Sequence, residues 1–234
     1  MPDTRPAGRG AAPLAFQKLA AEFLGTGALL AAVVGSGIMG ESLAGGNTAI
    51  ALLANAIATG AILVVLITVF APLSGAHLNP VVTAAMAWQR RLSPAMALGY
   101  AGAQTLGALA GTVLAHAMFA LPLLQVSDHL RTGWPQWLSE AVATAGLLLL
   151  ILRVAPREPK IVPALVGLYI TSAYWFTGST SFANPAVTLA RGLTQTFSGI
   201  RPGDMPAFWV AQTAGAFLAF LFHHLLGEEK KHAA

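Results

Sequence analysis

The sequence predicts an all-α membrane protein with six transmembrane helices and two shorter helices that enter the membrane without crossing it. Three observations lead to this fold class. Hydrophobic residues make up 56% of the chain and charged residues only 9%, whereas an ordinary soluble domain carries about 25% charged residues. Six apolar segments are long enough to cross a bilayer, and short motifs of the first half recur in the second. With so few charges, most of the outer surface must face an apolar medium.

The six apolar segments match the thickness of a bilayer, because a hydrocarbon core about 30 Å thick needs about 20 mainly apolar residues per helix. They are Leu19–Met39, Thr48–Ala71, Ala95–Phe119, Gln136–Val154, Ile161–Thr177 and Pro206–Gly227. Residues 1–18 are expected to form a disordered N-terminal tail, residues 19–227 a single membrane domain, and residues 228–234 a C-terminal tail. The chain has no cysteine, which excludes disulfides.

Two further stretches, Ser74–Trp88 and Ser179–Leu193, are too short to span and contain polar residues. Each contains an Asn-Pro pair, and Asn is a favoured N-cap while Pro is tolerated in the first helical turn. One such pair often marks only a turn. Two copies at matching positions predict two re-entrant half-helices, because irregular backbone at membrane depth is tolerated only inside protein or along an aqueous cavity.

The chain is an internal duplication, with repeats over about 19–119 and 136–227. The matching segments are Ala21–Thr26 with Ser139–Thr144, Leu78–Thr83 with Ala183–Thr188, and Tyr100–Ala108 with Phe208–Ala216. Since each repeat has an odd number of spans, the two repeats enter from opposite sides, which is a known plan for solute pathways. Lys and Arg concentrate in the segments on the side of the termini, so the positive-inside rule predicts both termini in the cytoplasm.

The two half-helices carry the chemistry of the predicted pathway. In an inverted repeat their N-termini meet near the bilayer centre, and each N-terminus carries a partial positive charge. Asn79 and Asn184 would offer amide donors to a passing oxygen. Such a site repels cations, orients dipoles and interrupts a continuous proton wire.

These residues resemble the signatures of the aquaporin, or major intrinsic protein, family. The resemblance rests on Ser74–Pro80, on Phe182–Ala186, on Glu22 with Thr26, on Glu140 with Thr144, and on a repeated Ala-Gln pattern. It implies the aquaporin hourglass fold, a homotetramer with one pore per protomer, and passive transport of small neutral solutes across a bacterial inner membrane. It implies no enzyme activity, cofactor, metal or nucleic-acid partner. The implied pore residues are Asn79, Pro80, Val81, Asn184, Pro185 and Ala186.

The resemblance also assigns supporting roles. It implies that Glu22 and Glu140 are buried and hold the re-entrant loops by hydrogen bonding; the alternative is a proton-relay role. His77 resembles the family's histidine at the cytoplasmic vestibule, or is a loop histidine bonded to backbone. The other histidines are expected to be interfacial or exposed and to bind no metal: His116, His129, His223, His224 and His232.

The expected selectivity filter departs from the family pattern. Val187 occupies the position where most members have Arg, and Thr59 occupies a position that is usually aromatic. Spacing assigns Ser181 and Ser172 to the remaining wall. This ring is expected to be wide, without a permanent charge or a large aromatic side chain. Similar filters occur in a bacterial branch associated with arsenic resistance, which favours glycerol-like polyols or neutral arsenic and other metalloid species, together with water.

Arg191 complicates this expectation, because it lies one helical turn beyond Val187. It either places a charge at the outer vestibule or caps the half-helix carbonyls or pairs with a loop acid. Three alternatives to a wide channel therefore remain open: a water-selective aquaporin with Arg191 as the filter charge, a structural protein with a closed pore, and a proton-coupled transporter using Glu22 or Glu140.

Overall fold

The computed structural model describes residues 13–227, and every regular element in that range is a helix. The long helices are α1 (Ala15–Leu43), α2 (Thr48–Ser74), α4 (Pro94–Met118), α5 (Trp134–Val154), α6 (Val162–Phe176) and α8 (Met205–Leu225). The short ones are α3 (Pro80–Trp88), α7 (Pro185–Arg191) and the 3₁₀ turn η1 (Pro202–Asp204).

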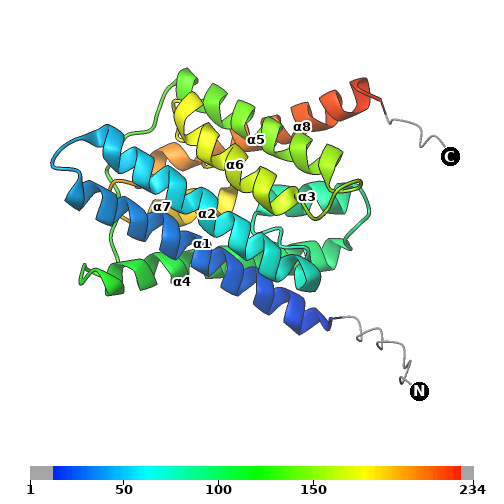
Figure 1. Ribbon diagram of the computed structural model, residues 1–234, viewed down its shortest axis with the longest axis horizontal. Coiled ribbons are helices and arrows are strands. Elements are labelled where there is room, and N and C mark those ends of the chain that lie inside the picture. Colours follow the sequence, from blue (N-terminus) through cyan, green and yellow to red (C-terminus); the bar gives the residue numbers. More distant parts are fainter. Residues whose placement is uncertain (1–12, 228–234) are drawn as a thin grey trace, which may run out of the picture.

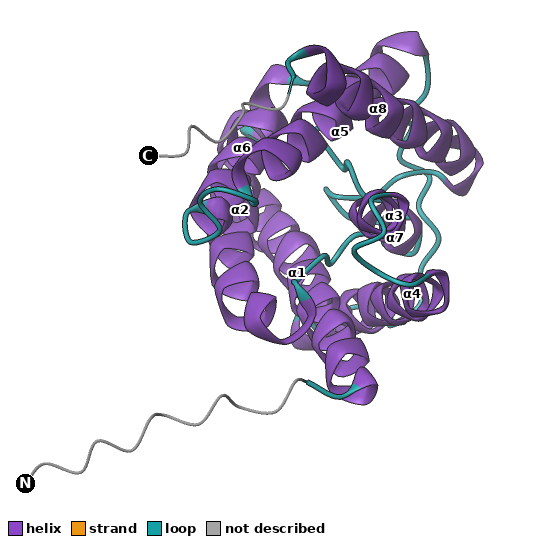
Figure 2. Cartoon of the chain, turned by 90° about the vertical axis from the view of Figure 1, so that its right-hand side faces the viewer, coloured by secondary structure: helices purple, strands orange, loops and turns teal. Residues whose placement is uncertain are grey.

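The long helices form a ring around the two short ones (Figure 2). Helix α1 packs against α2 and α4, helix α5 packs against α6 and α8, and the contact between α2 and α6 joins these two groups. The first turn of α1 and the last turn of α8 lie at the same end of the molecule (Figure 1). This arrangement is expected when two three-span repeats enter from opposite sides.

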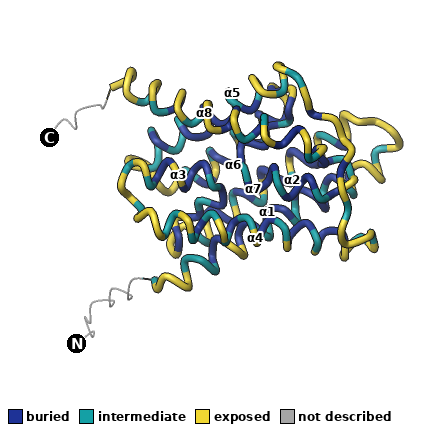
Figure 3. Tube along the Cα trace, turned by 180° about the vertical axis from the view of Figure 1, so that it is seen from behind, coloured by how far each residue is buried: buried dark blue, intermediate teal, exposed yellow. Residues whose placement is uncertain are grey.

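The outer surface has the apolar character of a membrane protein. Helices α1, α2, α5 and the segment Pro202–Leu225 are long and apolar enough to cross a membrane, and α6 is a shorter apolar helix. Large apolar residues are exposed on each of the six long helices. Exposed positions lie mainly at the periphery of the molecule and buried positions toward its interior (Figure 3). The predicted all-α membrane fold is therefore confirmed.

The helix ends differ from the expected ones by a few residues. The largest difference is at α1, which begins at Ala15, inside the segment expected to be a tail. Residues 1–12 and 228–234, which include most of the expected tails and His232, lie outside the described residues.

Glycines allow the long helices to approach closely at equivalent places in the two repeats. A Cβ added to Gly107 of α4 would overlap the carbonyl oxygen of Phe23 in α1, and one added to Gly215 of α8 would overlap that of Ala141 in α5. Small residues drive helix association in lipid because they let backbones meet. These contacts fix the ring that surrounds the half-helices.

Candidate functional site

The two half-helices begin in the same way. The Asn79 side-chain oxygen accepts from the Val81 N–H at 3.0 Å, and the Asn184 oxygen accepts from the Ala186 and Val187 N–H groups at 3.0 and 3.3 Å. Each Asn is followed by a Pro in the first turn. Both asparagines are therefore N-caps, as their sequence context predicts.

The half-helices also meet tip to tip. The Asn79 side-chain nitrogen donates to the Ala183 carbonyl oxygen, and the Asn184 nitrogen donates to the Leu78 carbonyl oxygen, both at 2.8 Å. Each repeat thus holds the Asn of the other. Because a primary amide carries two hydrogens, each nitrogen keeps one for a passing solute.

The backbone before each Asn adopts an unusual conformation at equivalent positions. Ala76 and Leu78 have φ values of 47° and 49°, and Ser181 and Ala183 have φ values of 51° and 46°. Left-handed conformations cost about 1–2 kcal/mol for a residue with a side chain. The loops adopt them because they turn successive N–H groups toward one carboxylate in each repeat.

Glu22 is that carboxylate in the first repeat, and it is fully buried. Its two oxygens accept from the Ser74 hydroxyl, from the His77 and Leu78 N–H groups, and from the Gln104 amide, at 2.6, 3.0, 2.7 and 2.7 Å. With both oxygens engaged and its side chain outside the cavity wall, Glu22 has the geometry of a loop-holding group and not of a proton relay.

Glu140 has the equivalent arrangement in the second repeat. It accepts from the Ser179 hydroxyl, from the Phe182 and Ala183 N–H groups, and from the Gln212 amide, at 2.6, 2.8, 2.8 and 2.7 Å. The geometry again supports the loop-holding role that the resemblance implies.

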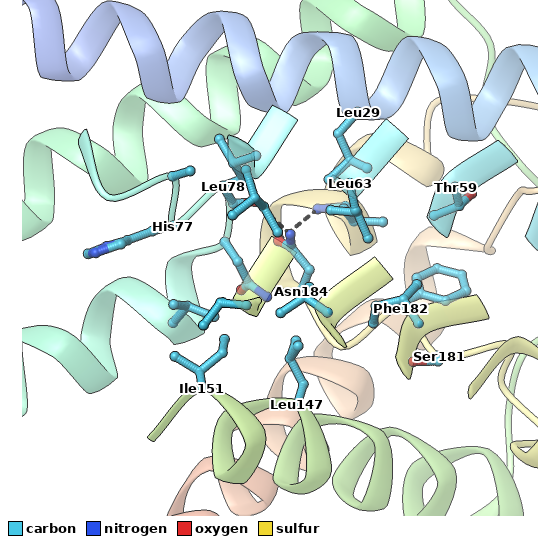
Figure 4. A pocket seen from close by; sticks show the side chains of 18 of the residues that line it. Leu29, Thr59, Leu63, His77, Leu78, Leu147, Ile151, Ser181, Phe182 and Asn184 are labelled. Atoms are coloured by element: carbon cyan, nitrogen blue, oxygen red, sulfur yellow. Dashed lines mark hydrogen bonds between the residues drawn. The ribbon is translucent and has the colours of Figure 1, made fainter. Parts of the chain in front are cut away.

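A cavity of about 270 Å³ runs past the tips of both half-helices. Most of its wall is aliphatic, with Leu29, Leu63, Leu147 and Ile151 around Asn184 in Figure 4. The polar side chains in the wall are those of Thr59, His77, Asn79, Tyr174, Ser181, Asn184 and Arg191. Pro80, Val81, Pro185 and Ala186 form the first turns of the half-helices and are not part of this wall.

His77 lies toward one end of the cavity, in the loop that precedes α3 (Figure 4). Its Nδ1 atom is 3.1 Å from the Thr83 hydroxyl, and its ring packs edge-on against Tyr100 with centroids 5.2 Å apart. The side chain therefore bonds to a side chain of the half-helix, while its backbone N–H bonds to Glu22.

The expected filter is partly wrong. Thr59, Ser181 and Val187 line the cavity, but Ser172 does not: it is exposed, and its hydroxyl donates to the Tyr169 carbonyl at 2.8 Å. Tyr174 takes its place, with its hydroxyl 3.2 Å from the Thr59 hydroxyl. Residues two apart lie about 200° apart around a helix, so a spacing error of two residues moves the assignment to the wrong face.

The expectation of a wall without a permanent charge or large aromatic is also wrong for this cavity. Arg191 is 1% exposed and lines the wall, with its guanidinium carbon 3.4 Å from the centre of the Phe182 ring. Its Nε atom donates to the Ser198 carbonyl, which belongs to the following loop and not to the half-helix. Within residues 13–227, no carboxylate forms an ion pair with Arg191.

Arg131 is a supporting residue that could not be selected from the sequence, because it lies in a loop without a recognisable motif. It is 8% exposed, and its guanidinium donates to the Gly199 and Ser179 carbonyls at 2.8 and 3.1 Å. Its backbone N–H donates to Asp204 at 3.0 Å. Arg131 thus ties the loop between α4 and α5 to the segment that precedes the second half-helix.

An apolar ring of helices around a cavity, with two opposed Asn-capped half-helices at its centre, defines a membrane channel. Comparison with known proteins agrees. The family model described as "Major intrinsic protein" matches residues 11–181. Aquaglyceroporin AqpS of Rhizobium meliloti (strain 1021) is 58% identical over 203 residues, which cover 87% of each chain. Aquaporin A of Dictyostelium discoideum is 31% identical over 92% of this chain and 80% of its own length.

The chain belongs to the major intrinsic protein family. Among solved structures, the aquaglyceroporin from Plasmodium falciparum has the same fold, with a TM-score of 0.69, 23% identity, and coverage of 92% of this chain and 98% of that one. The protein is accordingly a membrane channel for water and small solutes.

Proposed function

We propose that the protein passively conducts water and small neutral solutes such as glycerol through the cavity that Asn79 and Asn184 share. The observation that carries this proposal is the pair of asparagines, each in the cavity wall with one amide hydrogen left for a solute. A hydroxyl or water oxygen that accepts from both amides must point its own hydrogens away from the centre. That orientation interrupts a proton wire.

Cation exclusion follows from the charge at the same place. The N-termini of α3 and α7 each present a partial positive charge to the cavity. Arg191 adds a full positive charge to the wall. Dipoles and charges of this sign exclude cations and protons by an electrostatic barrier, while a neutral solute pays no such penalty.

The proposed solutes are glycerol-like polyols and neutral metalloid species, including arsenic species, in addition to water. Thr59, Tyr174 and Ser181 offer hydroxyls along one stretch of the wall, and the Ser181 hydroxyl is buried without a partner in the described chain. Val187 adds an apolar surface to the same wall. A wall with both apolar and hydroxyl groups suits an alcohol backbone. The 58% identity to a protein named aquaglyceroporin supports the same class.

A second candidate is a water-selective channel in which Arg191 serves as the filter charge. The observation that favours it is the guanidinium in the wall beside Tyr174 and Phe182, because a bulky cation and aromatic rings narrow the passage. The two candidates differ in one number, the ratio of glycerol to water permeability.

Stopped-flow light scattering on reconstituted vesicles tests both candidates. The panel is water, glycerol, urea and a neutral arsenic species, each compared with empty vesicles. Fast, non-saturating flux of glycerol and water without a proton gradient supports the first candidate, and water flux alone supports the second. Saturation with gradient dependence would indicate a proton-coupled transporter using Glu22 or Glu140, and no flux would indicate a closed-pore structural protein.

The assembly and orientation are part of the same proposal. We expect a homotetramer with one pore per protomer, in a bacterial inner membrane, with both termini in the cytoplasm. The shared end of α1 and α8 supports the common side of the termini. Since the chain has no native cysteine, single cysteines added at each end can be labelled from one side, and native mass spectrometry can count the subunits.

A further inference from the structure

His116 is a buried histidine that the channel described so far does not use. It lies near the end of α4, is fully buried, and does not line the cavity, so its expected place among interfacial or exposed histidines is wrong. Both ring nitrogens have partners: Nδ1 is 3.0 Å from the Leu123 carbonyl oxygen, and Nε2 is 2.8 Å from the Thr194 hydroxyl. A buried polar ring with both nitrogens engaged connects two parts of the chain.

The Thr194 hydroxyl continues into a row of hydroxyls within the loop after α7. It is 2.9 Å from the Thr196 hydroxyl, which is 3.5 Å from the Ser198 hydroxyl. Thr194 and Ser198 are fully buried. The inner side of this loop is therefore fixed by side-chain hydrogen bonds that begin at α4.

The outer side of the loop is held differently. The Gln195 backbone N–H donates to the Gln125 side chain at 2.8 Å, and the Gln195 side chain bonds to Asp128. These contacts are exposed, and they fix the tip of the loop. They do not reach Ser198.

The far end of the loop contacts Arg191 through two hydrogen bonds. The Ser198 carbonyl accepts from the Arg191 Nε atom, and the Ile200 N–H donates to the Arg191 carbonyl at 3.1 Å. Within residues 13–227 the terminal nitrogens of Arg191 have no hydrogen-bond partner. The Ser198 carbonyl and the Phe182 ring are thus the groups that set the direction of the guanidinium.

We propose that His116 is a positioning residue for the solute pathway: through Thr194, Thr196 and Ser198 it holds the loop whose carbonyl directs Arg191 into the cavity wall. This inference rests on the proposed function, because it assigns Arg191 an effect on solute passage. The loop that it holds belongs to the second repeat, whereas His116 itself lies in the first. His224 of α8 is the equivalent of His116, at the same separation as Gln212 from Gln104, but it is exposed, so it provides a matched control.

Proteoliposomes containing the full chain give the first test, with the glycerol-to-water permeability ratio as readout. Arg191→Leu removes a bulky cation from the wall, so the ratio should rise by about threefold or more. His116→Leu and Thr194→Val should raise it in the same direction by a smaller factor. His116→Gln, which can still bond to Thr194, should restore most of the wild-type ratio, and His224→Leu should not change it.

The double variant His116→Leu/Arg191→Leu separates positioning from a general loss of structure. If His116 acts through Arg191, the double variant has the ratio of Arg191→Leu alone, because coupled residues are not additive. The inference would be overturned if the effects of the two substitutions on the glycerol-to-water ratio multiply in the double variant. It would also be overturned if Arg191→Leu changes the ratio and His116→Leu leaves it at the wild-type value.

Hydrogen–deuterium exchange provides a second readout that does not depend on conduction. His116→Leu and Thr194→Val should speed exchange in peptides covering residues 192–200, and His224→Leu should not. Unchanged exchange in that loop would overturn the inference even if the channel conducts. Wild-type vesicles without water or glycerol flux would instead refute the proposed function, while faster loop exchange would still support the His116 connection.

Discussion

The two re-entrant regions share one design at the centre of the molecule and differ at their far ends. Residues before Asn79 and before Asn184 have matching left-handed backbones, matching carboxylates and reciprocal Asn-to-carbonyl bonds. Beyond the half-helices the match ends. Helix α3 runs into a short turn before α4, whereas α7 ends at Arg191, in a loop held by His116 and Arg131.

We infer from this difference that the centre of the molecule forms the passage and that the far end of the second half-helix contributes to the choice among solutes. The symmetric centre fixes two half-helices tip to tip, which any solute that crosses must pass. Under the proposed function, the wall that distinguishes solutes includes Tyr174, Val187 and Arg191, which come from the second repeat. Only Thr59 of this part of the wall comes from the first repeat. Symmetric parts should therefore respond equally to mutation, and asymmetric parts should change selectivity alone.

The largest effect is expected from the buried carboxylates. Glu22→Gln and Glu140→Gln each place an amide NH₂ against backbone donors, and hydrogen bonds to a charged group are worth about 1.5–3 kcal/mol each. Each variant should lose about 3 kcal/mol or more of stability. Thermal unfolding in detergent measures this loss, with Gln136→Ala, which removes an exposed bond to Gly178, as control. A large loss in one repeat and none in the other would contradict the shared design.

Next in size is a change at the wall of the second repeat. Val187→Arg adds a long cation to a surface that is now a branched apolar side chain, so it should narrow the passage. Glycerol permeability should fall roughly tenfold, more than water permeability, since a pocket discriminates by size to about this extent. Vesicle flux measures both, and Val187→Leu is the control of similar polarity. An equal loss of water and glycerol flux would argue against selection by size at this position.

The centre could be predicted from the sequence, and the selective wall only in part. Asn79 and Asn184 could be recognised because two Asn-Pro pairs at matching positions of a duplicated apolar chain predict two re-entrant half-helices. Tyr174 was missed because the connection from α6 to α7 is two residues shorter than the spacing assumed. The burial of Arg191 and His116 depends on how residues 192–200 fold back, and no local pattern predicts that.

A smaller effect is expected at the Tyr174–Thr59 pair. Tyr174→Phe keeps the ring but removes the hydroxyl that lies 3.2 Å from the Thr59 hydroxyl. The Thr59 hydroxyl then becomes free for solute, and a neutral hydrogen bond is worth about 1 kcal/mol. The glycerol-to-water ratio should change by about two- to fivefold. Ser172→Ala, on the opposite face of the same helix, should leave the glycerol-to-water ratio unchanged. A changed ratio in this variant would instead support the assignment of Ser172 to the filter.

The smallest expected effect is a pH dependence confined to the loop between α4 and α5. Partial desolvation of the ring lowers the pKa of His129, as do the positive charges of Arg131 and Arg191, against the opposing effects of Asp128 and Glu41. A histidine whose pKa is lower in the folded state stabilises the fold above its unfolded pKa of about 6.5. This contribution is lost as the pH falls below that value, because the unfolded chain then binds more protons.

Its magnitude is small because His129 is exposed and solvent screens its neighbours. Lowering the pH from 7 to 5 should decrease the unfolding temperature of the wild type slightly more than that of His129→Gln, by under about 2 °C. A His129→Gln variant that keeps the wild-type slope between pH 7 and 5 would exclude His129 as the source.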